Sequence, residues 1–206
     1  MDEVVVQEQR NFPKEVFSDP ESFRNLYKIG NLFAQSQLVP QAYQGKAMDC
    51  TIAVDMANRM GVSPMFVMQN LYVVKGKPSW SGQACMSMIQ ASGHFKNVLP
   101  VYTGEKGSDN RGCFIKAIRV SDGEEVAGTE ITVQMAKAEG WSSNKKWVTM
   151  TDQMLAYRAA AFFARVYIPS SLMGCAVEGE VEDGTQAKSK VVDPFEKKKV
   201  KNDIDS

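Results

Sequence analysis

Two arginines stand one heptad apart in the segment WVTMTDQMLAYRAAAFFAR, residues 147–165. From residue 152 to residue 167 the chain has no Gly or Pro and is rich in Ala, Leu and Met, which predicts a helix. At about 100° per residue, Arg158 and Arg165 point almost the same way, roughly 10 Å apart along the axis. Two permanently charged guanidinium groups on one face suit a run of phosphates. Two solvated arginines on an ordinary amphipathic helix would fit this segment equally well.

The opposite side of this helix is small and apolar, which predicts that it faces a core. Thr149 or Thr151 can cap the first turn, because a hydroxyl accepts a free amide proton there, and Pro169 ends the helix. The apolar side consists of Ala156, Ala160, Phe163, Ala164 and Tyr167.

Basic and aromatic residues also occur together outside this helix. Lys145 and Lys146 directly precede Trp147, and Lys77 and Trp80 share one predicted hairpin. A lysine can hold a phosphate, and an aromatic ring can stack on a base, which contributes about 1–3 kcal/mol per base. Packing in the core is the alternative role for Trp80.

The middle of the chain is basic, although the chain as a whole has a net charge of +0. Residues 71–119 carry seven basic and two acidic groups, and we expect one positive surface from them. Lys116 and Arg119 fall on the two sides of an alternating strand, so only a twist or bulge would bring them to one ligand. The candidate DNA-binding cations of this segment are Lys77, Lys96, Lys116 and Arg119.

Composition places the chain among globular proteins. It has 206 residues, 44% hydrophobic and 23% charged, enough for one domain with tails. No apolar run reaches the roughly 18 residues that span a bilayer, and the polar N-terminus does not resemble a secretory signal. The cysteines (Cys50, Cys85, Cys113 and Cys175) are widely spaced without a CxxC pair, which favours free thiols in a reducing cytosol.

Motifs for catalysis are missing from the sequence. Gly76-Lys77 is followed by Pro78, so it is not a nucleotide-binding P-loop, and GxGxxG is absent. The single histidine, His94, follows a glycine and is interpreted as a helix-end or surface residue. No carboxylate pair has a spacing typical of two-metal phosphoryl chemistry. The pattern favours binding over chemistry, and we expect no cofactor.

Capping residues, glycines and β-branched runs predict helices first, then strands, then a closing helix, an α+β order. We divide the chain into a flexible N-terminal arm (1–17), a globular core (18–175) and a disordered charged tail (176–206). The predicted core begins with helices at 18–36, 48–60 and 63–70, followed by a hairpin at 71–80 with its turn at Gly76-Lys77 and a helix at 81–93. Central antiparallel strands are predicted at 95–103, 112–121 and 124–133, the last two around an Asp122-Gly123 turn. A brief helix capped by Thr132, a loop at 141–146 and the long closing helix at 147–165 complete the prediction.

Two strings within residues 20–175 resemble the RecT-type recombinases of phages and prophages. The first is RMGVSP…LYVVKGKP…ASGHF, and the second is the closing segment with Trp147, Met154-Leu155, Arg158-Ala159 and Arg165, which is also similar to the Red beta annealing proteins. Where Red beta has a lysine before the Met-Leu pair, this chain has Asp152-Gln153. Unlike Red beta, the chain is expected to have no separate helical domain after residue 175.

The resemblance implies an ATP-independent protein that coats single-stranded DNA, assembles into rings or filaments and pairs the bound strand with its complement. It places phosphate-binding cations at Arg158 and Arg165, with Trp147 beside them. A phage exonuclease and a host single-strand-binding protein are the further partners that it implies. Two other hypotheses remain open: a nuclease on the same DNA-binding surface, and a scaffold whose cations serve subunit contacts.

Overall fold

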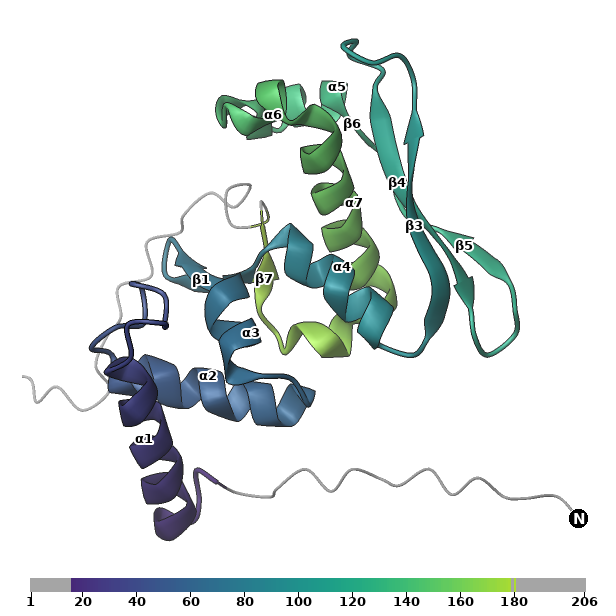
Figure 1. Cartoon of the computed structure of the whole chain (residues 1–206). Coiled ribbons are helices and arrows are strands. Elements are labelled where there is room, and N and C mark those ends of the chain that lie inside the picture. The colour runs from purple at the N-terminus through teal and green to yellow at the C-terminus, as the bar shows by residue number, and fades with distance from the viewer. Residues whose placement is uncertain (1–15, 179, 181–206) are drawn as a thin grey trace, which may run out of the picture.

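Figure 1 presents the computed structural model of the chain, which describes residues 16–178 and 180. Helices and two small sheets make up this part, so the predicted α+β class with antiparallel strand pairs is confirmed. The predicted N-terminal arm, apart from its last two residues, and most of the predicted charged tail lie outside the described residues. No helix among residues 16–178 and 180 is both long and apolar enough to cross a membrane.

Three helices open the fold where local sequence predicts them. They are α1 (Pro20–Ala34), α2 (Ala47–Met60) and α3 (Pro64–Asn70). The carboxylate of Asp19 accepts amide protons of the first turn of α1. Gly61 ends α2 with a φ of 66°, a left-handed conformation that glycine adopts without strain.

A three-stranded sheet follows, in the order β1-β2-β7. Strands β1 (Leu71–Val74) and β2 (Lys77–Trp80) form the predicted hairpin, but the turn is Lys75-Gly76, one residue earlier than predicted. Strand β7 (Ala176–Val177) pairs with β2 in parallel. The boundary predicted after residue 175 is therefore wrong by several residues, because the start of the predicted tail completes this sheet.

A second sheet contains β3 (Phe95–Thr103), β4 (Gly112–Arg119), β5 (Glu125–Ala127) and β6 (Ile131–Thr132), with β4 in its centre. The predicted long return strand is interrupted, and its two pieces both pair with β4. The predicted alternation of β4 is confirmed, since three alternate side chains have no exposed surface: Cys113, Ile115 and Ala117.

The predicted closing helix is two helices. After α5 (Val133–Ala138) and the turn Trp141–Ser143 come α6 (Lys146–Thr149) and α7 (Thr151–Tyr167). Met150 separates them, with φ −136° and ψ 42°. The hydroxyls of the flanking threonines, Thr149 and Thr151, donate to main-chain carbonyls one turn back, a competition with the backbone that often bends or ends helices. The helix ends at Tyr167, two residues before Pro169, as predicted, and Ile168 is its C-cap.

Helix α7 lies in the centre of the core, between the β3–β4 sheet and α4 (Gly82–Ala91) (Figure 1). Leu155 and Phe163 are both fully buried, and so are four alanines of the same helix. The two helices meet closely at Gly82, where a Cβ would lie 2.5 Å from the Cβ of Tyr157. The predicted apolar face is confirmed, and the burial extends well beyond that face.

We predict that none of the four thiols reacts with a soluble disulfide reagent in the folded protein. All four cysteines are free and buried, and burial raises the pKa of Cys85 to about 12 and that of Cys113 to about 11. Buried, protonated thiols are poor nucleophiles. Titration with such a reagent should count no thiols in buffer and four in denaturant. A thiol that reacts rapidly in buffer would contradict this packing.

Candidate nucleic-acid interface

Arg158 lies inside the protein. Its residue is only 6% exposed, and its guanidinium carbon lies 3.8 Å from the centroid of the Trp141 ring. The same guanidinium donates a hydrogen bond to the main-chain oxygen of Glu178. A desolvated cation–π contact contributes about 2 kcal/mol. Arg158 therefore connects α7 with the turn at residue 141 and with the chain that follows β7.

A second tryptophan extends this contact. The rings of Trp141 and Trp147 lie 5.9 Å apart between centroids, tilted by 32°, and Trp147 is 5% exposed. We call Trp141, Trp147 and Arg158 the tryptophan–arginine cluster. Trp147 and Arg158 line the same small cavity, so Trp147 does lie near Arg158 as the resemblance implies, but both residues are buried.

Arg165 occupies the same side of α7, as the heptad spacing predicts. Its Nε donates to Oε1 of Glu180 over 2.8 Å, and its Nη2 donates to the main-chain oxygen of Cys175 over 3.0 Å. The side chain of Arg165 is 37% exposed. Both arginines of the predicted phosphate-binding face are thus held by residues 175–180, which sequence patterns do not place there.

A groove of about 420 Å³ opens beside the tryptophan–arginine cluster. It lies between α4, β1 and α7, and Lys146 gives it a cation. Tyr72 and Tyr157 supply aromatic rings, and Glu178 supplies a carboxylate. Tyr157 and Glu178 also line a cavity of about 30 Å³ together with the two tryptophans and Arg158, so the groove and the cluster adjoin. Lys145, directly before Lys146, is exposed.

The remaining predicted cations lie on other elements than those that line this groove. Lys77 is exposed on β2 and Lys96 is exposed on β3. Lys116 pairs with Glu125 over 2.7 Å, and Arg119 pairs with an aspartate of its own turn, also over 2.7 Å. The structure therefore places Lys146 in the groove beside the cluster, with Lys145 next to it in the chain, and the sheet cations do not line this groove.

Trp80 is a core residue. It has no exposed surface, and its indole Nε1 donates to the main-chain oxygen of Leu172 over 3.1 Å. A ring without exposed surface offers no face to a base, so the predicted stacking role for Trp80 is wrong and the alternative, core packing, holds.

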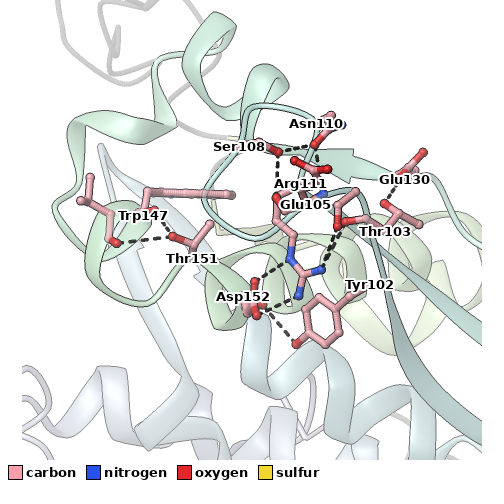
Figure 2. A network of polar contacts seen from close by, with 12 residues as sticks. Tyr102, Thr103, Glu105, Ser108, Asn110, Arg111, Glu130, Trp147, Thr151 and Asp152 are labelled. Atoms are coloured by element: carbon pink, nitrogen blue, oxygen red, sulfur yellow. Dashed lines mark hydrogen bonds and ion pairs between the residues drawn. The ribbon is translucent and has the colours of Figure 1, made fainter.

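A polar network that sequence reasoning missed fastens the β3–β4 hairpin to the start of α7 (Figure 2). Arg111 donates from Nε and Nη2 to the two carboxylate oxygens of Asp152, each over 2.9 Å. Its guanidinium lies 4.9 Å from the Tyr102 ring centroid, and the Tyr102 hydroxyl donates to the main-chain oxygen of Asp152. The hydrogen bonds from Arg111 hold the pKa of Asp152 below its usual range.

This network gives the carboxylate at residue 152 a structural role. The carboxylate there is already engaged by Arg111, and it lies in the first turn of α7, where the helix dipole favours a negative charge. Asp152 is thus a structural residue that orients the helix carrying both arginines. An acidic residue at a helix start could have suggested part of this role, but nothing in the sequence identifies Arg111 as its partner.

Comparisons with protein-family models, with curated proteins and with solved structures found no match for this chain. Among residues 16–178 and 180, no group of three or more His, Cys, Asp or Glu side chains is placed to hold a metal ion.

Proposed function

We propose that this protein binds single-stranded DNA and anneals complementary strands without ATP, as a homo-oligomeric ring or filament. The observation that carries the proposal is the groove beside the tryptophan–arginine cluster, with Lys146 and two tyrosines in its lining. The exposed Lys145 directly precedes Lys146 in the chain. Cations that follow a phosphate backbone and aromatic rings on which bases stack are the usual elements of sequence-independent strand binding. The resemblance of residues 147–165 to annealing proteins supports the same role.

Annealing makes a particular demand on such a groove. The protein must hold phosphates while the Watson–Crick edges stay free for the second strand, so cations should dominate over groups that read base edges. Affinity should then be independent of sequence and should fall steeply with salt. A phage exonuclease and a single-strand-binding protein are the further partners that we propose on the resemblance alone.

Replacing Lys145 and Lys146 together with alanine tests the groove. We expect affinity for a labelled single-stranded oligonucleotide to fall about tenfold at low salt, and the slope of log affinity against log salt to decrease by about 1.4, since each lost phosphate contact removes about 0.7. The annealing rate of two complementary oligonucleotides without ATP should fall in parallel. Both lysines are exposed, so folding should not change.

The matched control replaces Lys28 and Lys137, which are exposed lysines on α1 and α5, and changes the net charge by the same amount. Equal losses in the two double variants would contradict a role for the groove. Cleavage of the labelled strand on addition of a divalent metal would favour the nuclease hypothesis. Absence of any salt-sensitive binding would favour the scaffold hypothesis.

A further inference from the structure

Two acidic residues that follow β7 contact the arginine-bearing side of α7. Glu178 accepts from Arg158 through its main-chain oxygen, and its carboxylate accepts from the main-chain N–H of Gly82 over 3.2 Å. Glu180 receives Arg165 with both carboxylate oxygens, and one of them also accepts from the N–H of Val177 over 3.1 Å. We call Glu178 and Glu180 the acidic segment.

Glu178 is anchored more firmly to the rest of the protein than Glu180 is. Val177 is fully buried and paired with β2, and Glu178 donates its N–H to the main-chain oxygen of Trp80 over 2.9 Å. Glu180 lies beyond these anchors. The side chains of Arg165 and Glu180 are 37% and 32% exposed, so water reaches their ion pair. Ion pairs that water reaches contribute at most about 1 kcal/mol. The Arg165–Glu180 pair can therefore open while the sheet stays intact.

A carboxylate on a guanidinium resembles a phosphate in its geometry. Both anions present two oxygens to the paired N–H groups of an arginine. The side chain of Glu180 thus lies where a phosphate oxygen pair would lie on Arg165. The sequence continues with Glu182 and Asp183, so negative charge is concentrated in this part of the chain.

We propose that Glu180 is an internal competitor of single-stranded DNA: it occupies Arg165 until a backbone phosphate displaces it, and it thereby lowers the affinity of the protein for DNA. This inference rests on the proposed function. When DNA is bound, Arg165 contacts a phosphate; in the free protein, Arg165 pairs with Glu180. Arg158, which is buried against Trp141, remains a structural residue in both states.

Replacing Glu180 with glutamine (E180Q) removes the competing charge and keeps the size of the side chain. We expect affinity for a labelled oligothymidylate to rise about two- to fivefold, the factor that corresponds to the strength of a partly exposed ion pair. The slope of log affinity against log salt should become steeper by about 0.7. In the wild type, Arg165 releases a counterion from the strand, but the freed carboxylate of Glu180 takes a cation up; in E180Q only the release remains. Circular dichroism should be unchanged.

Two controls separate this contact from a general effect of charge. E21Q, on α1, makes the same charge change far along the chain and should leave affinity and slope unchanged. In an R165Q background, E180Q should give no gain, because the competed cation is absent. A gain from E21Q equal to that from E180Q, or a gain that persists with R165Q, would overturn the competition.

The outcomes also distinguish this inference from the proposed function. If the wild type binds the oligonucleotide and E180Q binds it equally well, the competition fails while the proposed function stands. If neither protein binds at low salt, both fail. Binding that is weak in the wild type and stronger in E180Q alone supports both.

Discussion

Replacing Phe163 with alanine is expected to lower the free energy of unfolding by about 3–5 kcal/mol, the usual cost of a large cavity in a core. Phe163 has no exposed surface. Its ring meets that of Phe95 edge to face at 5.2 Å and that of Tyr167 at 4.4 Å, so it joins α7 to β3. Urea or guanidinium unfolding followed by circular dichroism measures the change.

Phe17 gives the matched control for the same substitution. It is 55% exposed and lies before α1, so its loss should cost less than about 1 kcal/mol. Similar costs at Phe17 and Phe163 would mean that α7 is not the centre of the core.

Replacing Arg111 with alanine is expected to cost about 2–3 kcal/mol. The substitution removes the two hydrogen bonds to Asp152 and two longer ones to main-chain oxygens of residues 103 and 104. It leaves Asp152, whose side chain is 32% exposed, without its cation. It also removes the contact with the Tyr102 ring. Arg111→Lys should recover only part of the loss, because an ammonium group cannot bind both carboxylate oxygens in the same plane. Lys116→Ala, which breaks a well-exposed ion pair, should cost under about 1 kcal/mol.

The pH dependence of stability distinguishes this pair from simple packing. The folded-state pKa of Asp152 lies below its unfolded value, chiefly because Arg111 donates hydrogen bonds to the carboxylate. The stabilisation from Asp152 is therefore complete above the unfolded pKa of about 4 and is lost as the pH falls through the lower folded value. In Arg111→Ala this part of the acid loss should disappear. An unchanged acid profile would show that the two side chains are not coupled in solution.

Helix boundaries were largely predictable because their causes are local. Asp19 and Ser63 cap the helices that follow them, and Gly61 ends α2, all within one turn of chain. The break at Met150 was missed, because good helix formers on both sides outweighed the competing hydroxyls in a prediction from propensity alone.

The environment of the arginines could not be predicted in the same way. Helical spacing correctly put Arg158 and Arg165 on one side of α7, but it cannot tell whether that side meets water or another part of the chain. The covering residues come after β7, a strand of two residues whose length gives no periodicity. Its acidic surroundings favoured a disordered tail, although Val177 is fully buried.

Whether a candidate binding residue is exposed could be predicted for some residues and not for others. Lys145 and Lys146 are exposed, as lysines usually are, and their role in DNA binding stays a prediction. Trp80 was ambiguous in sequence, because the same ring suits a base or a core. Arg111 and Asp152 lie 41 residues apart, and nothing local connects them. The role of the protein in annealing stays a proposal that the binding experiments test.

The parallel pairing of β7 with β2 has a consequence for the order in which the chain folds. Trp80 donates to Leu172, 92 residues later, and the strands beside them close the same long loop. Such closure costs more chain entropy than the hairpins and helices within it, so it follows them in time. We therefore expect the acidic segment to reach the arginines late in folding. A nascent chain still missing these residues has both guanidinium groups without the contacts that Cys175, Glu178 and Glu180 supply.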